Sequence, residues 1–549
     1  MRNVKLRLKN GKTLEIPEGT RIIDAIGSVD EDVIAAKLDN KLVSLNYMVF
    51  IDSDLELVKI NSHDGYRVYE RSLTALLGYA LDKLSPKARL YVLHSYNNGI
   101  YCEIEGVEIT GELIARLKSS MEDVIRRNVE IYVDVIDEES AIKVFKKMSN
   151  REDAVRLFRF LPEHQRVCIF TIDDYADYSY IPLAHRTGVL RKFDLLIRNS
   201  GMIVLLPDEH NPEKIGPLKE SPKLFNTFEE SSRWARILGV NDAGAMNRFI
   251  TTGDVSDFIK IAEALHEKKI AQIADEITCE YGKIKLVLIA GPSSSGKTTF
   301  AKRLGIHLRV NEKNPVVISL DNYFVDRGKT PRDEHGNYDY DSIEALDLQL
   351  INEHLRDLLL GKEVAIPHFD FKRGKRSGIE KRIKLSKGDI IVIEGIHGLN
   401  PRLSELVPDE AKFRIYVSAL TQISVDSHNR ISTSDTRLIR RIVRDKLFRG
   451  HSALETLKMW PNVRRNEERY IFPFQENADV MFNSSLVYEL AVLKLYTDAM
   501  LEQVTPEHPE YGDAVRLLSI LSHFLGIMPT EVPPTSILRE FIGGSSFKY

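Results

Sequence analysis

Cysteine is scarce in this chain of 549 residues, which has only Cys102, Cys168 and Cys279. The three are widely spaced and form no C-x-x-C pair, which argues against a disulfide framework and against a cysteine-rich zinc site. Long hydrophobic runs are also missing, and none approaches the length of a membrane-spanning helix. The N-terminus alternates like a strand and lacks the apolar core of a signal peptide. These absences predict a cytoplasmic protein without membrane contact.

Excess charge of either sign is absent as well. The formal net charge is −4, so the chain as a whole does not attract nucleic acid, and any such binding would need a local patch. Hydrophobic residues make up 43% and charged residues 28% of the chain, which is typical of a globular protein with true cores. The length predicts three or more domains.

Patterning divides the chain into five segments. We expect a β-rich unit over 1–61, a mixed α+β unit over 62–222, a helical connector over 223–282, an α/β unit over 283–490 and a helical, then loop-like extension over 491–549. Asn10-Gly11 and Asp39-Asn40 predict hairpin turns in the first unit, and Thr20 is a candidate cap for a short helix. Short strands alternate with helical segments in the fourth unit, which predicts a doubly wound parallel sheet.

The strongest motif is "LVLIAGPSSSGKTTF", residues 286–300. It satisfies G-x-x-x-x-G-K-[ST], in which a glycine turn lets backbone N–H groups face phosphate oxygens at the positive end of a helix. The pattern places Lys297 on the terminal phosphates and the Thr298 hydroxyl on Mg²⁺. The predicted nucleotide-binding residues are Gly291, Pro292, Ser293, Ser294, Ser295, Gly296, Lys297, Thr298 and Thr299.

Two acidic residues follow predicted strands and are candidates for the chemistry at this loop. "DIIVIEGIHGLN" places Glu394 at a strand end, where a carboxylate can reach Mg²⁺ directly or through water. "ISLDNYF" places Asp321 at another strand end, beside the loop. A carboxylate there can accept the proton of a substrate hydroxyl, as a kinase requires. A purely structural capping role is the alternative for each.

The segment "DTRLIRRIVRDKLFRG", residues 435–450, carries five arginines at mostly helical spacing. One interpretation is a solvated basic helix. The other is a lid that brings arginines onto the transferring phosphoryl group and excludes water. These arginines are Arg437, Arg440, Arg441, Arg444 and Arg449. The chain has no N-K-x-D motif for reading guanine, which disfavours a GTPase.

Over about 284–485 the sequence resembles the uridine kinase and phosphoribulokinase family of P-loop kinases. The matching segments, in the family's order, are "GPSSSGKTT", "ISLDNYF", "YDSIEALDLQL", "IPHFDFKRGKR", "VIEGIHGLN" and "RLIRRIVRD". The resemblance implies ATP and Mg²⁺ as cofactors, Asp321 as general base, and Lys297, Thr298 and Glu394 as the phosphate and Mg²⁺ residues. It also implies a catalytic role for Arg444 in the lid.

The resemblance extends to the segments that bind the phosphate acceptor, but several positions there differ from the pattern of uridine kinases. Asp341 would contact sugar hydroxyls, but Asp341-Ser342-Ile343 stands where uridine kinases usually have "DHP". Phe369 and Gly374 align with a tyrosine and a nucleobase-reading histidine, and basic residues surround them. A site that loses a hydrogen-bonding partner usually loses selectivity by orders of magnitude. The resemblance therefore implies a hydroxyl acceptor, uridine or another compound. The implied acceptor-binding residues are Asp341, Phe369, Arg376 and Arg449.

The front of the chain has a separate resemblance. Residues 1–61 resemble a TGS domain, the β-grasp module of threonyl-tRNA synthetases and some GTPases, and 62 to about 205 resemble the synthetase's second additional domain, an editing-type α+β module. That family binds zinc with H-x-x-x-H and C-x-x-x-H pairs. Here Arg71, Ala75 and Ile181 replace three of the ligands and leave His185 alone. One imidazole cannot form a zinc site, so we expect a retained fold without tRNA editing.

Two hypotheses follow. The first is an ATP- and Mg²⁺-dependent kinase that phosphorylates an alcohol group of a nucleoside-like or other small acceptor, with the front modules serving regulation, assembly or RNA contact. The second is an RNA- or ribosome-associated NTP-binding switch that uses the front modules. We also expect a homo-oligomer.

Overall fold

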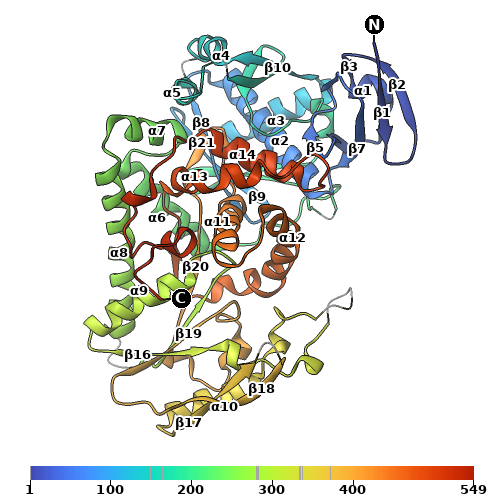
Figure 1. Cartoon of the computed structure of the whole chain (residues 1–549). Helices are drawn as coiled ribbons and strands as arrows, with labels where there is room; N and C mark the ends of the chain where they lie inside the picture. Colours follow the sequence, from blue (N-terminus) through green and yellow to red (C-terminus); the bar gives the residue numbers. More distant parts are fainter. Residues whose placement is uncertain are drawn as a thin grey trace.

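The computed structural model describes residues 2–148, 150–163, 165–209, 211–279, 283–332, 336, 338–370 and 373–548. The units of the N-terminal half occupy one end of the molecule and the parallel sheet of the second half occupies the other, with C-terminal helices between them (Figure 1). No helix within the described part has both the length and the apolar character needed to cross a membrane.

The first unit is a five-stranded sheet with strand order β2-β1-β7-β4-β5, in which only β1 and β7 pair in parallel. Its elements are β1 (Asn3–Leu8), β2 (Thr13–Pro17), β3 (Thr20–Arg21), α1 (Ile22–Ile26), β4 (Val33–Leu38), β5 (Lys41–Val43), β6 (Met48–Val49) and β7 (Ser53–Lys59). Both expected hairpins form, and Asp39 and Asn40 have positive φ values of 48° and 63°, as a two-residue hairpin turn requires.

The expected threonine cap is wrong. Thr20 pairs with Val49 in the short ladder between β3 and β6, and Arg21 precedes α1 without a side-chain cap. Strand pairing has overridden the local preference of threonine for a helix start. The assignment of this unit as a TGS domain stays a prediction.

The second unit has two antiparallel sheets, with strand orders β13-β14-β9-β8 and β10-β11-β12. Its strands are β8 (Arg89–Tyr96), β9 (Gly99–Glu105), β10 (Ile131–Asp137), β11 (Arg166–Ile172), β12 (Tyr175–Tyr178), β13 (Asp194–Arg198) and β14 (Gly201–Leu205). Its helices are α2 (His63–Leu84), α3 (Gly111–Arg127), α4 (Glu138–Phe145) and α5 (Glu152–Phe158). The Thr110 hydroxyl accepts a hydrogen bond from the Leu113 N–H and caps α3.

Three helices lead to the second half: α6 (Pro222–Leu238), α7 (Ala243–Thr252) and α8 (Val255–Cys279). The parallel sheet that follows has strand order β16-β19-β15-β20-β23, and all four of its pairings are parallel. Its strands are β15 (Leu286–Ala290), β16 (Asn314–Ser319), β19 (Asp389–Glu394), β20 (Lys412–Ser418) and β23 (Val480–Asn483). The strand that precedes Asp321, β16, is therefore separated from β15 by β19.

The parallel sheet is covered on both faces, as the alternation of strands and helices predicts. Val287 and Ile289 of β15 point to a core with α8 and α9 (Lys297–Val310), whereas Leu286 and Leu288 point to a core with α10 (Leu348–Leu359) and the hairpin of β17 (Val364–Asp370) and β18 (Lys375–Ile383). Side chains of successive residues in a strand face opposite sides of the sheet, which explains the apolar run of β15.

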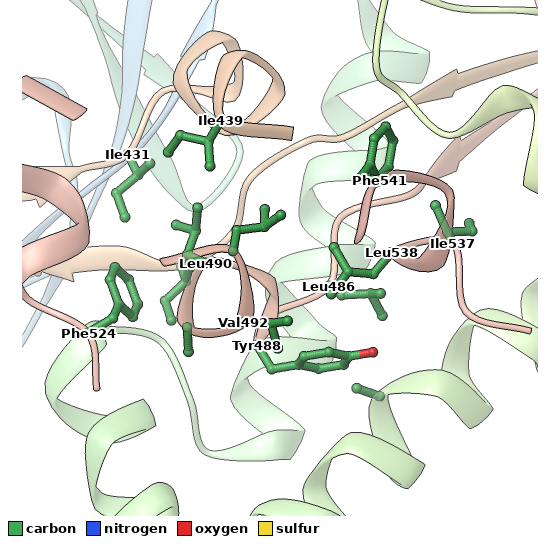
Figure 2. Close-up of a cluster of buried hydrophobic side chains, with 14 of the residues drawn as sticks. Ile431, Ile439, Leu486, Tyr488, Leu490, Val492, Phe524, Ile537, Leu538 and Phe541 are labelled. Carbon is green, nitrogen blue, oxygen red and sulfur yellow. The ribbon is translucent and has the colours of Figure 1, made fainter. Parts of the chain in front are cut away.

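The C-terminal extension belongs to the same core as the sheet. It contains α13 (Glu489–Leu501), α14 (Tyr511–Ser522) and α15 (Arg539–Ile542). Ile537, Leu538 and Phe541 are completely buried and lie beside Leu486 and Tyr488 (Figure 2). The last residues, expected to be loop-like, thus return to the α/β unit.

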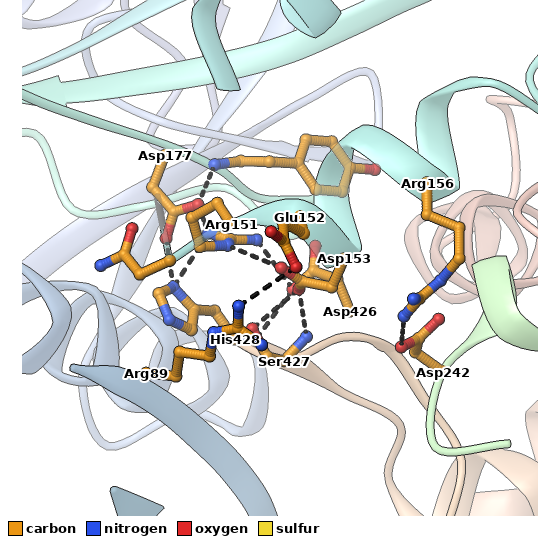
Figure 3. Close-up of polar contacts among 12 residues, drawn as sticks. Arg89, Arg151, Glu152, Asp153, Arg156, Asp177, Asp242, Asp426, Ser427 and His428 are labelled. Carbon is orange, nitrogen blue, oxygen red and sulfur yellow. Dashed lines mark hydrogen bonds and ion pairs between the residues drawn. The ribbon is translucent and has the colours of Figure 1, made fainter. Parts of the chain in front are cut away.

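A buried polar cluster joins the second unit to the α/β unit (Figure 3). The hairpin of β21 (Ser424–Asp426) and β22 (Asn429–Arg430) carries it from the α/β side. Arg151 is fully buried, forms an ion pair with Asp177 and lies 3.2 Å from Asp426 Oδ1, while His428 Nδ1 lies 2.6 Å from Asp177 Oδ2. Because these charges have no access to water, each depends on the others for its stability.

Arg151→Ala should therefore destabilise the whole molecule. The change leaves Asp177 and Asp426 buried without their cation, and we expect a loss of about 3–5 kcal/mol in the free energy of unfolding, seen as a large fall in Tm at pH 7. The exposed Arg159 lies on the same segment, and Arg159→Ala is the matched control with little change. Equal Tm values for the two variants would contradict a structural role for the cluster.

Candidate active site

The loop after β15 has the conformation that phosphate binding requires. Ser294 and Gly296 have positive φ values of 59° and 82°, and Gly296 precedes α9 without a side-chain cap. The helical hydrogen bonds of α9 begin with Phe300 N–H to Gly296 O at 3.0 Å. The preceding N–H groups are thus outside the helical ladder, at the positive end of the helix.

Glycine is required at both ends of this loop. A Cβ atom on Gly291 would lie 1.9 Å from Val417 O of β20, and one on Gly296 would lie 2.4 Å from Ile537 Cγ2. Gly291 thus allows the loop to approach the neighbouring strand, whereas Gly296 allows the C-terminal segment to pack on the start of α9.

Helix α11 (Thr433–Phe448) fixes the loop from behind. Arg437 Nε donates to Ser293 O at 2.9 Å, and Arg441 donates to Ser293 Oγ at 2.7 Å. Arg437 and Arg440 are buried and form ion pairs with Glu467 and Glu489. The interpretation of this segment as a solvated basic helix is wrong for these two residues, because their charges are neutralised inside the core.

Arg444 and Arg449, further along this segment, do face the site. Both line its cavity and contact Asp445, with Nε of Arg444 at 3.4 Å and an Arg449 guanidinium nitrogen at 3.3 Å from its Oδ1. Burial lowers the pKa of Arg444 to about 10, so it remains a cation at neutral pH. Two positive charges are thus available near the loop.

The loop, the ends of β16 and β19 and the segment from α11 to α12 enclose a cavity of about 530 Å³. Helix α12 spans Ala453–Tyr470. The predicted site residues that line the cavity are Ser293, Ser294, Ser295, Gly296, Lys297, Thr298, Asp321, Asp341, Glu394, Arg444 and Arg449. The structure therefore brings residues from widely separated parts of the chain into one cavity.

Hydroxyl and carboxylate oxygens meet at the start of α9. Thr298 Oγ1 donates to Glu394 Oε2 at 3.3 Å, and burial raises the pKa of Glu394. Uncharged and anionic oxygens are the ligands that Mg²⁺ prefers, and a buried carboxylate gains from a nearby cation. Thr298 and Glu394 thus fit a magnesium ion that also binds phosphate. No cluster of three or more His, Cys, Asp or Glu side chains suited to a metal occurs in the described ranges.

Lys297 and Asp321 flank this pair. Lys297 Nζ donates to Pro292 O at 3.0 Å, and burial lowers the pKa of Lys297. Asp321 lies in the 3₁₀ turn after β16, is accessible within the cavity, and has a pKa raised by partial desolvation. A raised pKa makes Asp321 a stronger base than a fully solvated aspartate.

Asp341, Asn466 and His397 also line the cavity and are polar. Asn466 Nδ2 donates to Asp341 Oδ2 at 2.5 Å. His397 is 3% exposed, and neither of its ring nitrogens makes a hydrogen bond of normal geometry with a described residue. Burial lowers the pKa of His397 to about 4, so this imidazole is neutral at pH 7. A carboxylate, an amide and a neutral imidazole together suit a ligand with several hydroxyl groups.

Two predicted acceptor residues do not line the cavity. Phe369 is buried, with its ring 5.7 Å from that of Phe324. Arg376 forms an ion pair with Asp347 at 2.9 Å and donates to Tyr323 O at 3.3 Å. Phe369 packs on Phe324, which lines the cavity, and Arg376 binds the carbonyl of the preceding residue, so both lie outside the lining and support it.

The residues that the resemblance aligns with zinc ligands make other contacts in this structure. Arg71 is buried, donates to Asn429 Oδ1 at 3.0 Å and to Tyr178 O at 2.7 Å, and has a pKa that burial lowers to about 10. His185 is also buried, and its carbonyl accepts a hydrogen bond from Asn46. An arginine that binds the hairpin of the α/β unit thus stands where the resemblance aligns a zinc ligand of the synthetase family.

Sequence reasoning misses several residues of this cavity, among them His397, Asn466 and Glu540. His397 lies within "VIEGIHGLN" but is not among the predicted site residues, although a histidine three residues after a predicted metal-binding glutamate is a visible signal. Asn466 and Glu540 reach the cavity from α12 and α15. Their local sequences carry no signal for this, because the contacts depend on the fold of residues far along the chain.

A parallel sheet with strand β15, a glycine loop with two residues at positive φ and helix α9 define a P-loop nucleotide-binding unit. The family model described as the phosphoribulokinase/uridine kinase family matches residues 286–490. A uridine kinase of Halobacterium salinarum is 30% identical over 194 residues, which cover 35% of this chain and 77% of that protein. The chain belongs to the phosphoribulokinase/uridine kinase family.

The other similarity is to a longer protein. A threonine–tRNA ligase of Clostridium kluyveri is 26% identical over 198 residues, or 35% of this chain and 31% of the ligase. The chain therefore spans about a third of the ligases it matches, and these matches fall on its N-terminal region, in agreement with the fusion that the sequence predicts. A D-glycerate 3-kinase from Cryptococcus neoformans, a solved structure, is 13% identical, covers 46% of this chain and 87% of its own, and has a TM-score of 0.23.

Gly296→Ala should destabilise the protein more than an ordinary glycine replacement. Gly239 has a similar φ of 68°, but a Cβ atom at this position would meet nothing within 4 Å, so Gly239→Ala carries the backbone cost alone, about 1–2 kcal/mol. Gly296→Ala adds the clash with the buried Ile537, and overpacking typically costs a further 1–3 kcal/mol. Thermal unfolding should give a larger fall in Tm for Gly296→Ala. A larger fall for Gly239→Ala would contradict the close packing at the loop.

Proposed function

We propose that this protein is an ATP-dependent kinase that transfers the γ-phosphoryl group to a hydroxyl of a small, polyhydroxylated acceptor such as a nucleoside. The observation that carries the proposal is the placement of Asp321, a free carboxylate with a raised pKa, in the same cavity as the P-loop. Membership of the phosphoribulokinase/uridine kinase family supports it.

The residues divide the chemistry among them. The loop N–H groups and Lys297 hold the triphosphate, and Thr298 and Glu394 hold Mg²⁺, which when bound neutralises phosphate charge. Asp321 accepts the proton of the acceptor hydroxyl as its oxygen bonds to the γ-phosphorus. The bond from that phosphorus to the β–γ bridging oxygen breaks, and ADP leaves. Arg444 stabilises the charge on the transferring group.

The acceptor end favours recognition of hydroxyl groups. Asp341, Asn466 and His397 offer acceptors and donors without a positive charge, which suits a neutral sugar or polyol. Phe369 packs on Phe324, and Arg376 binds the carbonyl of Tyr323, so both support the cavity from outside its lining. We therefore infer an acceptor bound through its hydroxyls, nucleoside or otherwise.

The alternative, an RNA- or ribosome-associated switch, has no specific support among the described residues. The second unit is held to the α/β unit by the buried cluster around Arg151. We propose that the front units act in assembly or regulation of the kinase, and homo-oligomer formation stays a prediction.

Asp321→Asn should abolish transfer while leaving ATP binding intact. Loss of the base is expected to lower acceptor-dependent ADP release about 10²–10⁴-fold, with an unchanged Kd for ATP. A coupled ADP-release assay across nucleosides, sugars and polyols provides the measurement. The matched control is Asp357→Asn, which removes a half-buried carboxylate of α10 that lies outside the cavity lining. Full activity of Asp321→Asn with any acceptor would exclude the proposed base.

His397→Phe should impair recognition of the acceptor without affecting the binding of ATP. The phenyl ring keeps the aromatic volume but loses both hydrogen-bonding nitrogens, so we expect kcat/KM for the acceptor to fall about tenfold or more, with the Kd for ATP unchanged. His368→Phe, at an exposed position of β17, is the control. An unchanged kcat/KM for the acceptor in His397→Phe would remove this residue from the acceptor site.

A further inference from the structure

The C-terminal segment takes part in the phosphate site. Its backbone is anchored by the completely buried Ile537, Leu538 and Phe541 (Figure 2). The Arg539 guanidinium donates to Pro529 O at 2.7 Å and, through Nε, to Val532 O at 3.2 Å. The segment is therefore a fixed wall of the site.

One side chain of this wall reaches the start of α9. Glu540 Oε2 accepts hydrogen bonds from the Thr299 N–H at 3.1 Å and from Thr299 Oγ1 at 2.7 Å. This N–H is the last one before the helical ladder begins at Phe300. Because the backbone N–H groups of a P-loop cradle phosphates, the Glu540 carboxylate is bonded to a group that a bound nucleotide needs.

The charge of Glu540 also reaches the other site residues. Burial is the main influence on the pKa values of Lys297, Glu394 and Arg444, and the Glu540 carboxylate raises all three. It thus adds a negative charge to a cavity that Glu394 and Asp321 already line. A triphosphate entering this cavity meets like-charge repulsion from Glu540.

We propose that the Glu540 carboxylate occupies a phosphate position and competes with the nucleotide for the Thr299 N–H and hydroxyl, so that this C-terminal residue sets the affinity for nucleoside triphosphate. The inference rests on the proposed function, in which the loop binds ATP. Glu540 is half-buried, whereas Leu538 and Phe541 close to it are buried, so rotation of its side chain vacates the position without moving the segment. Arg444, which shares the cavity, is a cation available to the displaced carboxylate.

The test is the Kd of the full-length protein for ATP, measured calorimetrically with Mg²⁺ and with EDTA. Glu540→Gln keeps an acceptor oxygen for Thr299 but removes the charge, and we expect about tenfold or tighter binding under both conditions. Glu540→Ala also empties the position and should bind at least as tightly. Glu531→Gln removes a charge from an exposed position of the same segment and should match the wild type.

Each outcome separates this inference from the proposed function. Unchanged or weaker binding by Glu540→Gln, while the wild type binds ATP and Lys297→Ala does not, overturns the competition alone. Weaker binding only in the presence of Mg²⁺ also overturns it, because Glu540 would then serve the metal. Absence of ATP binding by the wild type and both Glu540 variants overturns the proposed function together with the inference.

Discussion

The structure depends on the way buried arginines hold the phosphate loop by its carbonyl groups. Arg437 binds Ser293 O and Arg440 lies 3.4 Å from Ser294 O. The Ser293 N–H in turn donates to Glu467 Oε1 at 2.9 Å, so the carboxylate that pairs with Arg437 also binds the loop. The arrangement is stable because Glu467 and Glu489 neutralise the two guanidinium groups. Truncating one member would leave its partner as an uncompensated buried charge.

The same helix connects the phosphate loop with the front of the molecule. At the start of α11, Asp435 Oδ1 lies 2.5 Å from Arg516 of α14 and 3.6 Å from Arg67 of α2. The hairpin of β21 and β22, which precedes α11, enters the buried cluster around Arg151. The synthetase-like second unit and the kinase-type unit thus share one helix and one set of buried charges.

Local patterns predict much of this fold. The hairpins at Asn10-Gly11 and Asp39-Asn40 and the parallel sheet around β15 follow from turn chemistry and periodicity. The prediction for Thr20 is wrong because pairing between β3 and β6 outweighs a cap preference. The loop residues and the acidic strand ends are also recognisable locally, and the structure places them in one cavity.

Long-range contacts explain the rest. Glu540 is 241 positions from Thr299, and Arg437 and Arg440 are 30 and 49 positions from the carboxylates that neutralise them. A run of arginines in sequence carries no sign of such partners, so the sequence alone indicates a surface helix or a lid. The predicted acceptor residues Phe369 and Arg376 show the same limit of local sequence patterns. In the folded protein Phe369 packs on Phe324 and Arg376 binds Tyr323 O, so neither side chain lines the cavity.

The central claim is transfer of a phosphoryl group to a small hydroxyl compound. The most direct measurement is mass spectrometry of a metabolite mixture incubated with the full-length protein, Mg²⁺ and ATP labelled with ¹⁸O in the γ-phosphate. The account predicts a neutral hydroxylated compound that gains one labelled phosphoryl group, in amounts equal to the ADP formed. ADP accompanied only by labelled inorganic phosphate would contradict it, because water would then be the acceptor.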